Sequence, residues 1–201
     1  MVAIVSLGAC SGGRTVTVPQ PGDIVPPTFH TVPTDLARSP QLTALVARDT
    51  AGLDPTDQRA DAMLLTAALD ALRASDDAPT ELSRLAVYGD YAYVSYEQGG
   101  VNGRSVNGTY RDDGEGLRLS DPVFSDDPTF PLASVDPSVP VAVAAAVEAR
   151  VPNAVVSRID LEPGRSYGFG LVWNIGVTDA RGTLASVFVD LDGAIVAVDQ
   201  S

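Results

Sequence analysis

Two sets of four short β-prone runs place the strongest limit on what this chain can fold into. In the first set, after Pro79, apolar and polar residues alternate with a period of two, as in a strand with one buried face. The runs of the first set are separated by Gly-Asp, Gly-Gly-Val-Asn-Gly and Asp-Asp-Gly, which are hairpin signals. The runs are "ELSRLAVYG", "YAYVSYE", "RSVNGTYRD" and "EGLRLSD" after Pro79, and "AVVSRIDLE", "YGFGLVWNIGVTD", "TLASVFVDL" and "AIVAVD" after Pro152.

A helix is predicted before each set, because an Asp-Pro pair precedes an apolar segment both times. Asp54-Pro55 opens a helix that should run to about Ser75, with Asp57 as an anion in its first turn, and Asp136-Pro137 precedes the helix "SVPVAVAAAVEARV". The first helix should bury Leu65, Leu69 and Leu72, with Met63, Leu64 and Ala68 nearby. A shorter helix is expected from Ser39-Pro40 to about Arg48, with Leu42, Leu45 and Val46 as its apolar stripe.

These patterns predict an α+β fold built from two tandem units, each with one helix packed on a four-stranded antiparallel meander. We place the first unit at residues 39–128 and the second at 129–201. Leu82-Ser83-Arg84-Leu85-x-Val87 aligns with Val156-Ser157-Arg158-Ile159-x-Leu161, which favours two copies of one unit. The alternative is one α+β domain whose hairpins look alike because turns use few residue types.

The second unit resembles a PepSY domain. Its alanine-rich helix ends near Pro152-Asn153, a central strand carries an aromatic residue, and the last hairpin reads "VFVDLDGAIVAVD". The tandem arrangement is also similar to secreted β-lactamase inhibitory proteins, although the disulfides of that family are impossible with one cysteine. Both resemblances imply a binding or inhibitory module, and the PepSY family has no catalytic residues to carry over.

The single cysteine, Cys10, stands near the N-terminus and cannot form an intramolecular disulfide. Leu7, Gly8, Ala9 and Cys10 together resemble the lipobox of bacterial lipoproteins. The resemblance implies that residues 1–9 are a signal peptide remnant, that Cys10 is lipidated, and that the protein is anchored on the extracytoplasmic face of the cell membrane. Because no basic residue precedes Arg14 and the apolar run is short for a signal peptide, we expect the true start to lie upstream of Met1.

A flexible linker is expected between the anchor and the folded part, over residues 10–38. The stretch from Ser11 to about Pro33 is rich in Gly, Pro, Thr and Val and shows no helical or strand periodicity. It reads as a disordered tether that holds the folded part away from the membrane surface.

The charge balance narrows the choice of partner. The chain has 26 acidic residues against 13 basic ones, all arginine, and a formal net charge of -13. Such a chain repels phosphate, which argues against nucleic acid and against a polybasic membrane contact. No apolar run is long enough to span a membrane. The absence of lysine, with abundant Ala, Val, Asp and Arg, resembles the codon bias of a GC-rich genome such as an actinobacterium's.

The sequence offers little for catalysis or metal binding. His30 is the only histidine, and it lies in the tether, where a catalytic base is not held rigidly. Asp190-x-Asp192-Gly193 and Asp112-Asp113-Gly114-Glu115 resemble pieces of calcium loops but fit β-turns better. We therefore expect no enzyme activity, cofactor or metal. A hydrolase would need a buried carboxylate pair in a cleft.

The aromatic residues of the central strands remain as candidates for binding. Trp173 shares a strand face with Ile175 and Val177 and is expected in the core. Tyr91 and Tyr93 alternate with Ala92 and Val94. If the latter two face the helix, the tyrosines lie on the open face and form a partner-binding site. The reverse assignment would bury them.

The sequence therefore favours a lipid-anchored, non-catalytic protein whose tandem sheets bind an unidentified protein or peptide partner, as an inhibitor or regulator of a secreted enzyme would. The alternative is a surface carrier of an apolar ligand. A carrier would need a large cavity lined by the Val, Leu and Ala positions of both units.

Overall fold

The computed structural model describes residues 40–43, 45–46, 48–49, 54–76, 78–98, 103–163 and 170–200. The lipobox, Cys10, the tether and His30 lie outside these ranges. The helices are α1 (Pro40–Thr43), α2 (Met63–Arg73) and α3 (Ser138–Arg150). The strands are β1 (Glu81–Tyr88), β2 (Tyr91–Glu97), β3 (Arg104–Arg111), β4 (Gly116–Leu119), β5 (Val123–Phe124), β6 (Phe130–Pro131), β7 (Ala154–Pro163), β8 (Leu171–Asp179), β9 (Gly182–Val189) and β10 (Ile195–Gln200).

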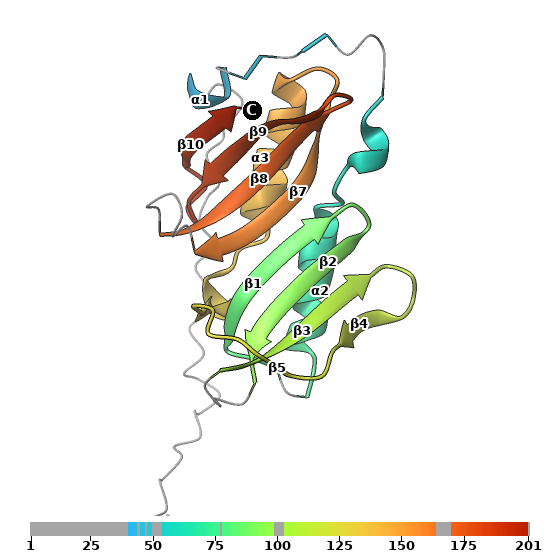
Figure 1. The fold of residues 1–201 in the computed structure, drawn as a ribbon, viewed down its shortest axis with the longest axis vertical. Coiled ribbons are helices and arrows are strands. Elements are labelled where there is room, and N and C mark those ends of the chain that lie inside the picture. Colours follow the sequence, from blue (N-terminus) through green and yellow to red (C-terminus); the bar gives the residue numbers. More distant parts are fainter. Residues whose placement is uncertain are drawn as a thin grey trace, which may run out of the picture.

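Within the described residues, the strands form one antiparallel sheet of ten strands (Figure 1). Its main order is β10-β9-β8-β7-β1-β2-β3-β4, with β5 beside β3 and β6 beside β1. The predicted α+β class is confirmed. The two sets of predicted runs lie side by side as successive hairpins, and the pairing of β1 with β7 joins them into a continuous sheet.

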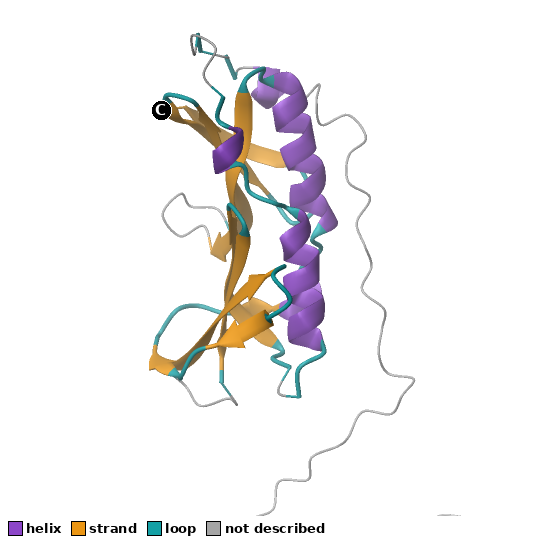
Figure 2. Cartoon of the chain, turned by 90° about the vertical axis from the view of Figure 1, so that its right-hand side faces the viewer, coloured by secondary structure: helices purple, strands orange, loops and turns teal. Residues whose placement is uncertain are grey.

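The two longer helices lie on the same face of this sheet (Figure 2). Trp173, Ile175 and Val177 of β8 are fully buried, as expected for core positions. Of the two face assignments left open for β2, the structure has Ala92 and Val94 on the core face, where both are buried together with Tyr96. Helix α2 contributes Leu64, Leu65, Ala68, Leu69 and Leu72, and α3 contributes Val139, Pro140, Val143, Ala144 and Val147.

The predicted first half of the helix before β1 is wrong. Only a 3-10 turn forms at Thr56–Gln58, and Arg59 has extended backbone angles. Helix α2 begins at Met63, whose backbone N–H donates to Oδ1 of Asp61 over 3.0 Å. An aspartate side chain can accept this bond from the backbone N–H two residues later, so Asp61 supplies a second possible helix start. It competes in this with the earlier pair Asp54-Pro55. Met63 stands at this start and is 62% exposed, which corrects its expected place beside the core.

The N-terminal described segment packs against the second set of strands. Helix α1 contacts β10 and α3, and both Leu42 and Leu45 are buried. Arg48 then forms a bidentate ion pair with Asp179 at the end of β8. Its Nε and Nη2 donate to Oδ2 and Oδ1 of Asp179, each over 2.7 Å. Its Nη2 also donates to the carbonyl of Gly182 over 3.0 Å. The hydrogen bond from Arg48 holds the pKa of Asp179 below its ordinary value, despite the opposing effect of burial.

Candidate functional site

The sheet face opposite α2 and α3 carries a polar and aromatic cluster where β1 meets β7. Residues that pair across antiparallel strands share a face. Leu85 pairs with Leu161 and both belong to the core under the helices. The neighbouring pairs Ala86–Asp160 and Tyr88–Arg158 therefore point to the other face.

Asp160 lies at the centre of this cluster and is only 2% exposed. Its Oδ1 accepts hydrogen bonds from the hydroxyl of Tyr88 over 2.8 Å and from Nη2 of Arg84 over 3.0 Å. Its Oδ2 lies 2.9 Å from Nε of Arg158, an ion pair without hydrogen-bond alignment. Two guanidinium groups and one hydroxyl therefore surround a single buried carboxylate. We call Arg84, Tyr88, Arg158 and Asp160 the Asp160 cluster.

The protonation states of Tyr88 and Arg84 follow from these contacts. Burial, with the hydrogen bond to Asp160, raises the pKa of Tyr88 to about 12, so its hydroxyl stays protonated and donates at neutral pH. Burial acts to lower the pKa of Arg84, but the charge of Asp160 and the bond to it outweigh burial and raise it. Arg84 also donates to the Tyr88 oxygen over 2.5 Å. Tyr88 and Arg84 are thus both donors at physiological pH.

Tyr91 and Tyr93 extend the same face across β2, and both are half-buried. The guanidinium of Arg84 lies 5.8 Å from the ring centre of Tyr93, and that of Arg111 lies 5.0 Å from the ring centre of Tyr91. The rings of Tyr88 and Tyr91 are 5.7 Å apart. Alternating arginines and tyrosines therefore hold one another in place, at distances suited to cation–π attraction.

We call the pairing of β1 with β7 the seam of the sheet. Two β-bulges determine how these two strands orient their side chains. One interrupts the β1–β2 register between Leu82 and Arg84, and the other interrupts the β7–β8 register between Val156 and Arg158. A bulge inserts one residue into one strand and re-aims the side chains beside it. Both cluster arginines stand directly after their bulges. Gly176 faces Arg158 across β7–β8, and an added Cβ there would lie 3.3 Å from the Cβ of Arg158.

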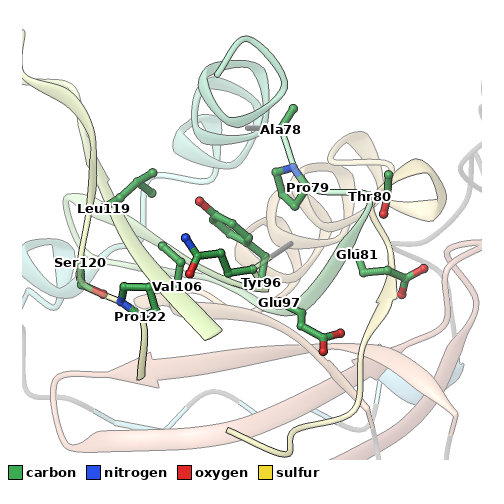
Figure 3. Close-up of a pocket in the computed structure, with 11 residues that line it drawn as sticks. Ala78, Pro79, Thr80, Glu81, Tyr96, Glu97, Val106, Leu119, Ser120 and Pro122 are labelled. Atoms are coloured by element: carbon green, nitrogen blue, oxygen red, sulfur yellow. The ribbon is translucent and has the colours of Figure 1, made fainter. Parts of the chain in front are cut away.

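A separate cavity of about 690 Å³ opens at the end of the first set of strands (Figure 3). Tyr96 and Val106 form its floor, with Pro79 and Leu119 on opposite sides. The lining residues all come from positions 78–122. This cavity therefore does not favour the carrier alternative, which needs a cavity lined by both sets of strands.

The Asp160 cluster is suited to binding rather than to proton or group transfer. Asp160 is already saturated by a hydroxyl and two cations, so it is not a free base, and none of its neighbours is an activated nucleophile. In the described part of the chain no group of three or more His, Cys, Asp or Glu side chains could hold a metal ion. No described helix is long and apolar enough to cross a membrane.

The sequence singled out Tyr91 and Tyr93 as candidates for binding, and the structure places them beside a cluster that it did not single out, Arg84, Tyr88, Arg158 and Asp160. One available signal was that Arg84 and Arg158 occupy the same position in the alignment of the two sets of strands. The lipidation candidates Cys10, Leu7, Gly8 and Ala9 lie outside the described residues. No protein family model, curated protein or solved structure matches the chain.

Proposed function

We propose that this chain is a lipid-anchored extracytoplasmic protein without catalytic activity, which binds a protein or peptide partner through the sheet face holding the Asp160 cluster, Tyr91 and Tyr93. The observation that carries the proposal is the composition of that face. Tyrosine and arginine are the residue types that dominate binding energy at protein interfaces. Here they are partly exposed, with the side chains of Arg84 and Arg158 at 43% and 40%.

Preorganisation gives this face a further advantage. Long arginine side chains lose rotamer freedom when a partner binds, which costs affinity. Arg84 is already held by Asp160, Tyr88 and the Tyr93 ring, and Arg111 by Asp90 and the Tyr91 ring. Much of that entropic cost is therefore met on folding.

The test is capture of partners from membrane extracts of the source organism by the immobilised protein. The variant Tyr91→Ala with Tyr93→Ala should weaken capture of a specific partner by at least about tenfold, since truncated hot-spot tyrosines cost a few kcal/mol each. Met63→Ala is the matched control, because Met63 is exposed but lies at the start of α2. Normal capture by a folded double variant would rule out this face.

The anchor is tested separately. We expect Cys10→Ala to abolish membrane association on fractionation of cells that express the full precursor, because the proposed lipid chains supply the attachment. If the variant still sediments with membranes as the parent does, the lipid-anchor proposal is wrong.

We further propose that the chain consists of two copies of a helix-plus-four-strand unit, the second PepSY-like. Three features support this. Both sets of strands run in sequential order from the seam, α2 and α3 precede them on the same sheet face, and the two bulges fall at aligned positions. Ser83 and Ser157, the extra residues of the bulges, bond to Ser95 of β2 and Thr178 of β8 respectively. The test is to superpose the two halves with their strands matched in chain order. If a different strand order gave a better superposition, the two-copy proposal would be wrong.

A further inference from the structure

The end of the first set of strands, far along the sheet from the pairing of β1 with β7, combines exposed apolar side chains with carboxylates that form no ion pair with any described arginine. Phe124 is 84% exposed, and Leu119 and Val123 are each 47% exposed. Large apolar residues this exposed within a six-residue stretch are unusual on a soluble surface and mark interaction sites. We call this region, residues 119–127 with the cavity beside it, the tip surface.

The segment that forms the tip surface is held against the sheet by backbone pairing and side-chain contacts. β5 pairs with the start of β3, and Phe124 lies opposite Arg104 in that register. The ring of Phe124 covers Gly103, where an added Cβ would come within 2.8 Å of the ring. The backbone N–H of Ser125 also donates to the carbonyl of Gly103 over 2.9 Å. Phe124 is thus held in place while most of its side chain faces solvent.

Two hollows flank this position. The cavity of about 690 Å³ lies beside Leu119 and Pro122, and a second hollow of about 480 Å³ is lined by Phe124 and the residues after it. Glu97 lines both hollows and so connects them. Figure 3 shows Tyr96 within the first cavity, Leu119 on one side and Glu81 on the other. A bulky apolar side chain has room to insert there.

The charge around the tip surface is one-sided. Five carboxylates surround it, and none forms an ion pair with an arginine in the described part of the chain. They are Glu81, Glu97, Asp121, Asp126 and Asp127. Arg104 is the nearby cation, which leaves an excess of four negative charges. Three carboxylates elsewhere on the sheet, Asp160, Asp179 and Glu148, are by contrast paired with Arg158, Arg48 and Arg59.

From this juxtaposition we infer that the tip surface binds a cationic peptide segment of a partner that carries a bulky apolar anchor residue. The apolar anchor enters the cavity between Leu119 and Tyr96. The adjoining part of the segment crosses Phe124 in the second hollow, and the flanking basic residues meet the carboxylates. The net charge of -13 attracts such a segment at long range and repels both a second copy of the chain and an anionic lipid surface. This site is separate from the Asp160 cluster and does not depend on the function proposed for it.

The experiment measures binding of a short labelled peptide, with several arginines around one central phenylalanine, by fluorescence anisotropy on the full chain. Matched peptides replace the arginines with glutamates, or the phenylalanine with serine. We expect micromolar binding of the first peptide, and at least about tenfold weaker binding of either control. Raising the salt from about 0.05 M to about 0.5 M should weaken binding of the first peptide several-fold.

Two variants locate the contact. Phe124→Ala should raise the Kd at least about tenfold with an unchanged melting temperature, because the removed ring is mostly exposed. Glu97→Gln with Asp126→Asn and Asp127→Asn should raise the Kd about three- to tenfold and flatten its salt dependence. Asp112→Asn with Asp199→Asn removes exposed carboxylates elsewhere and should have little effect.

Four results would overturn the inference. These are no binding of the basic peptide, equal binding of the peptide without arginines, equal loss of binding in the Asp112 and Asp199 variant, or unchanged binding by Phe124→Ala. Concentration-dependent dimerisation that Phe124→Ala abolishes would assign the surface to a second copy instead. Tyr91→Ala with Tyr93→Ala should bind the peptide normally, so failure here is distinguishable from failure of the proposed function.

Discussion

Replacing Asp160 with alanine removes the acceptor around which the seam between β1 and β7 is organised. The carboxylate is 2% exposed and accepts from Tyr88 and Arg84, with Arg158 as its second cation. After the substitution the guanidinium groups of Arg84 and Arg158 lie near each other without the negative charge that both of them pair with. We expect a clear loss of stability with the overall fold retained, since the core residues on the other face are unchanged.

The size of that loss follows from the number and exposure of the contacts. A hydrogen bond to a charged group contributes about 1.5 to 3 kcal/mol, and removing one partner of a buried ion pair costs about 3 to 5 kcal/mol. The arginine side chains are 43% and 40% exposed, so water replaces part of what they lose. We therefore expect about 3 kcal/mol, which lowers the Tm by about 6 to 12 °C for a chain of this size.

Thermal and denaturant unfolding followed by circular dichroism measures the effect. Glu115→Ala is a suitable control, because its ion pair with Arg118 lies on the surface and should contribute less than about 1 kcal/mol. If Asp160→Ala destabilises the protein no more than this control, the cluster is a solvated surface contact and our reasoning about the seam fails.

A second substitution tests the relation between the halves. Ala86 pairs directly with Asp160 across the seam and aligns with it in the two proposed copies. Ala86→Asp added to Asp160→Ala moves the carboxylate to the equivalent position, between the same two arginines. Two copies related by a pseudo-twofold axis at the seam predict recovery of at least about half of the lost stability. Further destabilisation would contradict that relation.

Three further predictions concern single contacts. In a spectrophotometric titration Tyr88 should ionise near pH 12, and Tyr88→Phe should remove that step. Because the folded-state pKa of Tyr88 is raised, its stabilising effect is present below about pH 10 and lost as the pH rises through 12. Asp179→Asn should lower the Tm at neutral pH, because it removes the charge that pairs with Arg48. The pKa of Asp179 is lowered by this pairing, so the difference in Tm between parent and variant should shrink as the pH falls below about 4 and the carboxylate takes up a proton. Gly108→Val should cost about 1 to 3 kcal/mol in denaturant unfolding, since an added Cβ would lie 2.8 Å from the side chain of Val94 in β2 and 3.0 Å from that of Leu119 in β4. A neutral result would show that these two side chains move aside at little cost.

The sequence predicted the strands well where the signal is local. The alternation in β1, β2, β7 and β9 and the turns between hairpin strands depend on neighbouring residues, so they can be seen in the sequence. The two-residue strands β5 and β6 were missed, because two residues are too few to show a period. The β1–β7 pairing was also absent from the prediction. Nothing in a strand's own pattern says which distant strand will cover its edge.

The site was predicted only in part for a similar reason. Tyr91 and Tyr93 stood out because aromatic residues alternate with small apolar ones along β2. Asp160 gave no such signal: aspartate is disfavoured in strands, and its environment depends on Arg84 and Tyr88 of a strand far away in sequence. Only the tertiary pairing makes a buried carboxylate acceptable at that position.

The ion pair between Arg48 and Asp179 bears on how the chain reaches its folded state. It joins residues 131 positions apart, and Leu42 and Leu45 are buried beside it in the same segment. A chain emerging N-terminus first exposes this segment long before β8 and β9 exist to receive it. Non-local contacts of this kind slow folding, because the entropy of closing a long loop is lost before the contact contributes any stabilisation. The first described segment is therefore expected to dock among the last, which ties completion of the fold to synthesis of its C-terminal hairpins.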